Sequence, residues 1–529
     1  MLTDYLVIGS GAAGLSFALK VAEHAHVVIV TKDDISQSNT NYAQGGICSV
    51  TYPPDTFEKH IRDTEICGAG ICNHETVEMV VTRAPERIKD LVQWGTRFDK
   101  NKGGRYDLAR EGGHSEHRIL HHKDITGAEI ERALVSQVKL HKNITVLEHH
   151  FAVDVLTQHH LGQLVTKHTE GVECYGAYVM DLKQGRIMTV LSKFTVIASG
   201  GLGNAYNVTT NPSVATGDGI SMAHRARAAI ENMAFIQFHP TALYNPGERP
   251  AFLISEAMRG FGAILRLQNG KEFMHKYHEM GSLAPRDVVA RSIDHELKIS
   301  GEEYVYLDVT HKDPQEVMNH FPNIYRKCLS IGTDITKEMI PVAPAAHYCC
   351  GGVKVDLNGE SSIKGLYVLG ESSCTGLHGA NRLASNSLTE AVVYADQAAK
   401  HSLRHLPQAR LMKGIPNWND DGTVATEEMS LIIQNVKEMQ QIMSNYVGIV
   451  RSDLRLERAL RRLEIIYKET EELYRRSKLN RSLCELRNMI DVGYLIIKDA
   501  QRRKESIGLH YSLDYPMRKE EGRADVAGR

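Results

Sequence analysis

Three glycines near the start of the chain, Gly9, Gly11 and Gly14, have the spacing of a phosphate-binding turn. In a Gly-x-Gly-x-x-Gly motif the first glycine allows a tight turn, the second lets backbone amides approach a pyrophosphate, and the third lets a helix pack closely on a strand. The motif is weak evidence by itself, but here it follows an apolar segment and precedes a helical pattern, as the mechanism requires. We therefore predict that this turn binds a dinucleotide.

The elements that must position this turn are a strand at residues 5–9, a helix at 15–24 and a second strand at 26–31, which together form a βαβ unit. The end of the second strand departs from the dinucleotide pattern. A carboxylate usually stands there to bind the ribose hydroxyls, whereas this chain has Lys32. Residues 194–201 and 365–371 are further apolar segments with glycine at their ends, and we predict that they are strands of the same sheet.

The spacing of these strands along the chain predicts the domain organisation. Because strands of one sheet recur so far apart, the residues between them fit an inserted domain that caps the cofactor. Near the C-terminus, leucine, isoleucine and methionine recur with helical spacing at 426–444, 453–475 and 483–504. The predicted fold is α/β and α+β multidomain, with a discontinuous Rossmann-type cofactor-binding domain at 1–238 and 345–415, a capping domain at 239–344, and a C-terminal helical domain at 416–529.

Two further segments could meet the polar edge of a ring cofactor. Residues 38–46 form a polar loop that ends in paired glycines, although an ordinary loop could have this composition. Residues 385–390 are typical of a helix start with a capping residue, whose unpaired amides stabilise negative charge. Glu371 ends a predicted strand near this region. We expect both segments to contact the cofactor.

Composition excludes several classes of partner. With 62 basic and 64 acidic residues among 529, the net charge of −2 provides no large positive field for nucleic acid or an anionic membrane. The apolar stretch at residues 5–8 is too short for a signal peptide, and no segment approaches a membrane-spanning length. Nine scattered cysteines, an odd number, favour reduced thiols and a cytoplasmic protein, and no cysteine and histidine cluster has zinc-ligand spacing. We expect no metal.

Four longer motifs carry a family resemblance over nearly the whole chain. They are Ala-Gln-Gly-Gly at 43–46, Gln-Phe-His-Pro-Thr at 237–241, Ala-Pro-Arg-Asp at 284–287 and His-Gly-Ala-Asn-Arg-Leu at 378–383. With these motifs the chain resembles the fumarate reductase, succinate dehydrogenase and L-aspartate oxidase superfamily of FAD enzymes. In the membrane-complex dehydrogenases of that superfamily, a histidine before the first motif bonds covalently to FAD, and this chain has Asn39 there. The resemblance therefore implies non-covalent FAD.

A second position separates the branches of the superfamily by substrate. Glu111 stands where the dicarboxylate dehydrogenases typically place phenylalanine. A carboxylate suits an ammonium group, and aspartate is essentially succinate with an α-amino group that needs a countercharge in a confined site. The resemblance thus implies the aspartate-oxidising branch, with a solvated loop glutamate as the alternative interpretation of Glu111.

The resemblance also assigns roles to residues of this chain. It implies that Arg286 transfers the proton, as acid when fumarate is reduced, although a guanidinium normally stays protonated. Two departures concern the same region: Ser255 replaces a threonine, and Phe261 replaces a glutamate. The implied substrate-binding residues are His239, Ser255, Glu256, His347 and Arg382. The implied FAD-binding residues are Gly9, Ser10, Gly11, Ala12, Ala13, Gly14, Lys32, Asn39, Thr40, Tyr42, Ala43, Gln44, Gly45, Gly46, Val153, Asp218, Glu371, Ser387 and Leu388.

The expected activity is oxidation of L-aspartate to iminoaspartate, with electrons passed to dioxygen, giving hydrogen peroxide, or to fumarate, giving succinate. By resemblance this is the first step of NAD biosynthesis through quinolinate, with quinolinate synthase as a candidate partner and a monomer or weak homo-oligomer as the expected state. The main alternative is a soluble fumarate reductase or succinate dehydrogenase flavoprotein. A non-catalytic dinucleotide-binding scaffold would explain the glycine turn but not the convergent histidines and arginines.

Overall fold

The computed structural model describes residues 1–425 and 429–516 and is built around a seven-stranded sheet. The strand order is β6 (Ile144–Glu148), β2 (Val27–Thr31), β1 (Leu2–Ile8), β9 (Arg186–Ile197), β8 (Gly176–Asp181) and β7 (His150–Leu156), with β16 (Leu366–Val368) also paired to β9. Strands β6, β2, β1, β9 and β16 are parallel, and β8 is antiparallel to both of its neighbours. The predicted segments 194–201 and 365–371 are thus confirmed as strands of the sheet that contains β1.

The turn after β1 explains the spacing of the glycines. Gly9 has φ +113°, and a Cβ there would lie 2.1 Å from the carbonyl oxygen of Ala198. A Cβ on Gly14 would lie 2.4 Å from the carbonyl oxygen of Gly9. Helix α1 spans Ala12–Val21, so it begins and ends three residues before the predicted helix, because the end of the glycine motif forms its first turn.

Helices cover both faces of the sheet, as a buried parallel sheet requires. On one face α1 packs with α3 (His74–Gln93), α4 (Thr126–Leu140) and α10 (Asn386–His405) in an apolar core that includes Tyr5 and Val7 of β1. On the other face Leu6 and Ile8 join a core with Met222 of α5 (Asp218–Arg225). Smaller elements around this body are α2 (Phe57–Cys67), β3 (Ile47–Cys48), β4 (Leu108–Ala109), β5 (Ile119–Leu120), β10 (Ile230–Glu231), β15 (Gly352–Lys354) and β17 (Ser373–Cys374).

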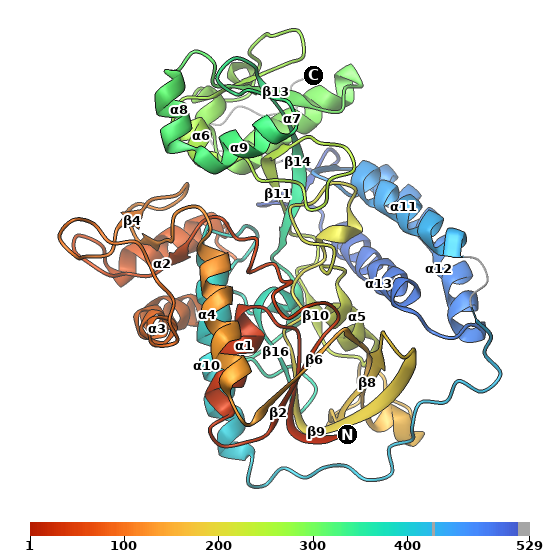
Figure 1. The fold of residues 1–529 in the computed structure, drawn as a ribbon. Coiled ribbons are helices and arrows are strands. Elements are labelled where there is room, and N and C mark those ends of the chain that lie inside the picture. Colours follow the sequence, from red (N-terminus) through yellow and green to blue (C-terminus); the bar gives the residue numbers. More distant parts are fainter. Residues whose placement is uncertain (426–428, 517–529) are drawn as a thin grey trace.

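The predicted insertion has a hydrophobic core of its own. It lies above the sheet in Figure 1 and is joined to the rest of the chain through β11 (Ile236–Leu243) and β14 (Ile340–Cys349). Residues from 243 to 342 form its apolar cluster. The other elements of the insertion are α6 (Glu256–Gly260), β12 (Ile264–Arg266), α7 (Arg286–Ser300), β13 (Val305–Asp308), α8 (Pro314–His320) and α9 (Pro322–Ser330).

The predicted C-terminal helices are present as α11 (Met429–Tyr446), α12 (Asp453–Arg476) and α13 (Arg481–Arg502), drawn in blue in Figure 1. The predicted start of the first helix at Thr426 lies outside the described residues. Short strands β18 (Val450–Arg451) and β19 (Tyr511–Ser512) pair beside these helices. The apolar faces of α11, α12 and α13 share one core with Leu202, Ile220 and Ile236, so this region packs directly on the cofactor-binding part of the chain.

Two expectations from composition can be compared with the structure. All nine cysteines carry free thiols. None of the helices in residues 1–425 and 429–516 combines the length and the apolar character that crossing a membrane requires.

Candidate active site

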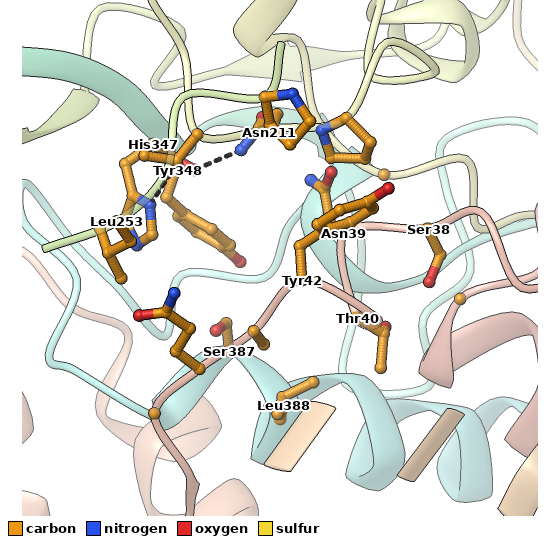
Figure 2. Close-up of a pocket in the computed structure, with 18 of the residues that line it drawn as sticks. Ser38, Asn39, Thr40, Tyr42, Asn211, Leu253, His347, Tyr348, Ser387 and Leu388 are labelled. Carbon is orange, nitrogen blue, oxygen red and sulfur yellow. Dashed lines mark hydrogen bonds between the residues drawn. The ribbon is translucent and has the colours of Figure 1, made fainter. Parts of the chain in front are cut away.

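A cavity of about 1290 Å³ lies between the carboxyl end of the sheet and the inserted segment. Its walls come from the turn after β1, the ends of β2, β9 and β16, the loop at 38–46 and the start of α10, with α6, α7 and α9 on the opposite side. Ligands of open parallel sheets bind at this edge. Figure 2 shows His347 and Tyr348 across the cavity from Ser387 and Leu388, with Asn39 and Tyr42 on a third side.

Most of the predicted cofactor residues line this cavity. Of the nineteen, Gly14 and Val153 do not: Gly14 packs against the backbone of Gly9, and Val153 is buried in an apolar cluster, with its carbonyl oxygen accepting from Arg225. The neighbours of Val153 on β7, Phe151 and Ala152, do line the cavity. The structure therefore does not bring Val153 itself to the cavity.

The phosphate end of the cavity fits a dinucleotide. Helix α1 begins there with Gly11 as its N-cap, and the first amides of a helix have no partner within the helix, so they favour an anion. Thr40 accepts from the amide of Ala12 at 3.0 Å, and a Cβ on Gly11 would lie only 3.3 Å from the same hydroxyl. Because Gly11 has no side chain, Thr40 can approach the turn this closely, and Gly11, Ala12 and Ala13 still line the cavity.

The predicted flavin loop carries a polar group that is prepared for a ligand. Asn39 donates to Glu371 at 2.7 Å, while its own Oδ1 is buried without a partner in residues 1–425 and 429–516. Burial raises the pKa of Glu371 to about 7, even though Asn39 and the amide of Cys349 hydrogen-bond to its carboxylate. Together with the open turn at α1, this cavity wall fits FAD, and no histidine occupies the position where a covalent bond could form.

Two histidines and an arginine face one another at the other end of the cavity. The rings of His239 and His347 are 5.7 Å apart. Burial, and then the charge of nearby arginines, lowers the pKa of both histidines well below the usual range, so both are neutral at pH 7. His239 Nδ1 accepts from the amide of Thr241 at 3.3 Å, which leaves its proton on Nε2. A neutral imidazole in this state can donate to a carboxylate.

Arg382 is buried and fixed from three directions. It donates to Gln237 Oε1 at 3.1 Å and to Ser387 Oγ at 3.2 Å, and its guanidinium lies 4.7 Å from the ring centroid of Tyr348. An arginine held in one orientation suits bidentate binding of a carboxylate.

Arg286 begins α7 and belongs to a chain of charges in which Arg259 is buried, while Arg286 and Glu256 are half-buried. Its Nε contacts Glu256 Oε2, and the other oxygen of Glu256 is 3.2 Å from Arg259. Burial opposes ionisation of Glu256, but the two arginines outweigh it and lower the pKa of the carboxyl. Burial likewise opposes charge on Arg286, but Glu256 and then Glu111 raise the pKa of its guanidinium. Ser255, the predicted neighbour, caps α6 by accepting from the amide of Ala257.

Glu111 lies on the same cavity wall as the flavin loop. It accepts from Ser385 Oγ at 2.6 Å, and Ser385 accepts from the amide of Gly46 at 3.2 Å. A Cβ on Gly45 would lie 2.7 Å from Glu111 Oε1, so this carboxylate touches the loop directly. The structure therefore brings Glu111 to the cavity that holds Arg286, rather than leaving it on a solvated loop.

Three contacts that orient the site were not predicted: Arg259 behind Glu256, Ser385 beside Glu111, and Gln237 beside Arg382. Arg259 follows Glu256 at i+3, a helical spacing that could have been found from the sequence. Ser385 adopts φ +63°, a left-handed backbone conformation that serine rarely adopts. The local sequence pattern does not predict this conformation. Phe261, which replaces the glutamate expected from the family resemblance, packs against the rings of His320 and Phe321.

Comparison with protein families gives two matches. Residues 4–388 match the family model described as FAD binding domain, and residues 436–526 match that of the fumarate reductase flavoprotein C-terminal region. The chain is 48% identical to the chloroplastic L-aspartate oxidase of Oryza sativa subsp. japonica, over 98% of this chain and 83% of that protein. It is 47% identical to the L-aspartate oxidase of Yersinia pestis, over 97% of this chain and 96% of that protein.

Solved structures with the same fold include E. coli quinol fumarate reductase, with a TM-score of 0.85 at 28% identity over 99% of this chain and 93% of that one. Mycobacterium smegmatis Sdh1 has a TM-score of 0.84 at 29% identity over 98% of this chain and 90% of that one. The arrangement of sheet, insertion and C-terminal helices is therefore shared with these proteins along nearly the whole chain.

Proposed function

The chain belongs to the L-aspartate oxidase family of FAD-dependent enzymes, and we propose on that premise that it oxidises L-aspartate to iminoaspartate. The electrons pass to dioxygen, giving hydrogen peroxide, or to fumarate, giving succinate. The product enters NAD biosynthesis through quinolinate. FAD is bound without a covalent link and supplies the acceptor of hydride.

The observation that supports this proposal is the charge pattern of one cavity. Arg286 and Arg382 provide two cations for the two carboxylates of the substrate, and neutral His239 and His347 provide hydrogen-bond donors beside them. Glu256 lies in the same cavity but is paired with both Arg286 and Arg259, and Glu111 adds a further anion. Succinate and fumarate have no group for that anion to bind, whereas aspartate has an ammonium.

The residues can then divide the reaction between them. Arg286, Arg382 and the histidines hold the carboxylates while hydride leaves Cα. The ammonium must lose one proton as the carbon–nitrogen double bond forms, and we assign Glu111 to accept it. When fumarate is reduced instead, Arg286 donates the proton to carbon, and the ion pairs to Glu256 and Arg259 provide a route for replacing it.

The activity is tested with purified yellow protein in an assay for peroxide that compares L-aspartate, N-acetylaspartate and succinate. We expect peroxide with L-aspartate only, because acetylation removes the ammonium and succinate lacks it. Oxidation of succinate without turnover of L-aspartate would establish the soluble dehydrogenase alternative. A flavin that no dicarboxylate bleaches under anaerobic conditions would establish a binding scaffold without catalysis.

Replacing Ser385 with alanine tests how Glu111 is held. The change removes the 2.6 Å hydrogen bond to Glu111, and we expect kcat/KM for L-aspartate to fall roughly tenfold, the effect of one hydrogen bond to a charged group. Fumarate reduction should change little, because it does not use that carboxylate. The measurement is both rates on the same enzyme preparation.

A matched control is Ser402→Ala, which removes a buried hydroxyl from the same helix, α10, far along the chain from the cavity. It should alter neither rate. If Ser385→Ala lowers both rates equally, Ser385 acts through the flavin loop by way of Gly46 and not through Glu111.

We further propose a cytoplasmic enzyme that is a monomer or weak homo-oligomer and delivers its product to quinolinate synthase. An imine is hydrolysed in water, so an enzyme that condenses it must act soon after release. Sedimentation of the protein with and without quinolinate synthase measures both points, and a stable tetramer or the lack of any association would contradict them.

A further inference from the structure

The cofactor cavity has an unusual polar group at the end of β2. Lys32 stands where dinucleotide-binding domains usually carry the carboxylate that binds ribose. Its ammonium lies 2.6 Å from Asp218 at the start of α5 and 2.7 Å from Glu485 of α13. Lys32 and Asp218 line the cavity, whereas Glu485 reaches Lys32 from outside it. Carboxylates from two distant elements thus meet at the position where β2 supplies none.

Burial makes this cluster sensitive to each of its charges. Burial opposes charge on Lys32, but Asp218 and Glu485 outweigh it and raise the pKa of the ammonium. Asp218 is fixed as well: its Oδ1 accepts from Thr216 at 2.8 Å and from Asn488 at 2.8 Å. Both groups that face the cavity therefore owe part of their orientation to α13.

The contacts from α13 come from one face of that helix. Arg481, Glu485 and Asn488 have the spacing i, i+4 and i+7, which places them on one side. Arg481 donates to Glu485 at 2.9 Å and to the carbonyl oxygen of Lys32 at 3.3 Å. This face contacts the end of β2 through Arg481 and Glu485, and the start of α5 through Asn488.

We propose that α13 contributes to the cofactor site by orienting two residues that bind the hydroxyls of the adenosine ribose. Glu485 holds Lys32 as a hydrogen-bond donor, and Asn488 holds Asp218 as an acceptor. Glu485 is a positioning residue, since it acts through Lys32. In this arrangement Asp218 replaces the missing carboxylate of β2, and the C-terminal helices contribute to FAD affinity although they do not line the cavity.

The test measures the binding of FAD and of FMN to the apoprotein of Glu485→Gln. Binding is detected by the quenching of flavin fluorescence. FMN lacks the adenosine, so it reports on the flavin end alone. We expect the Kd for FAD to rise roughly tenfold, the effect of losing a hydrogen-bonded ion pair, and the Kd for FMN to stay the same. Glu472→Gln, an exposed glutamate of α12, is the matched control and should change neither.

Three outcomes would overturn the proposal. An unchanged Kd for FAD would remove Glu485 from the cofactor site, and an equal loss for FAD and FMN would indicate a general effect on folding. Tighter FAD binding would show that Glu485 acts only through long-range charge. If Glu485→Gln does not fold, as circular dichroism would reveal, Arg481→Gln removes a contact to Lys32 from a more exposed position and must show the same selective loss. Because only binding is measured, the result does not depend on the substrate.

Discussion

Replacing Glu111 with glutamine is expected to lower kcat/KM for L-aspartate about a hundredfold, because removing one partner of a buried hydrogen-bonded charge pair costs about 3 kcal/mol. Glutamine keeps the shape of the side chain and its contact with Ser385 but loses the negative charge that the ammonium requires. Fumarate reduction by the same variant should stay within about threefold of the original rate, since no ammonium is present. The measurement compares the two rates with the flavin content of each preparation.

Glu116→Gln is the matched control for this change. Glu116 lies on the same loop and pairs with Lys59 at 2.6 Å, away from the cavity lining. It should leave both rates unchanged. Equal losses of aspartate oxidation and fumarate reduction in Glu111→Gln would contradict the role of Glu111 in substrate selection and would make it part of the flavin environment.

The cofactor end of the fold could be predicted from sequence because its signals are local. The spacing of Gly9, Gly11 and Gly14 predicts a turn between a strand and a helix, and the structure places the turn at the end of β1, between the parallel strands β2 and β9. The sequence predicts a helix that starts at residue 15, whereas the last three residues of the glycine motif, 12–14, already belong to the first turn of α1. Local patterns thus identify an element better than its ends.

The polar contacts that orient the site lie beyond any local pattern. Ser385 and Glu111 are separated by 274 positions, and Lys32 and Glu485 by 453. Periodicity describes only which face of an element is buried, so it cannot say which distant side chain meets that face. Motif resemblance pointed to Arg286 and Arg382 because their neighbours along the chain are distinctive, and both line the cavity. The contacts of Ser385 and Glu485 needed the structure.

Replacing Arg286 with glutamine is expected to abolish both activities, with a loss of about a thousandfold or more. The half-buried ion pair with Glu256 is lost and the substrate also loses a cation, which together cost about 4 kcal/mol. Arg286→Lys should recover little, since an ammonium cannot reproduce the planar contacts of the guanidinium with Glu256 and a carboxylate. The measurements are steady-state oxidation of L-aspartate and reduction of fumarate, together with the flavin spectrum to establish that FAD is still bound.

The matched control for Arg286 is Lys298→Gln on the same helix, α7, where an exposed lysine pairs with Asp294 at 2.5 Å. It should leave both rates intact. If Arg286→Gln lost fumarate reduction but kept aspartate oxidation, then Arg286 would serve only as the proton donor to carbon. Arg382 and the two histidines would in that case have to bind both substrate carboxylates without it, and the charge balance proposed for this cavity would be wrong.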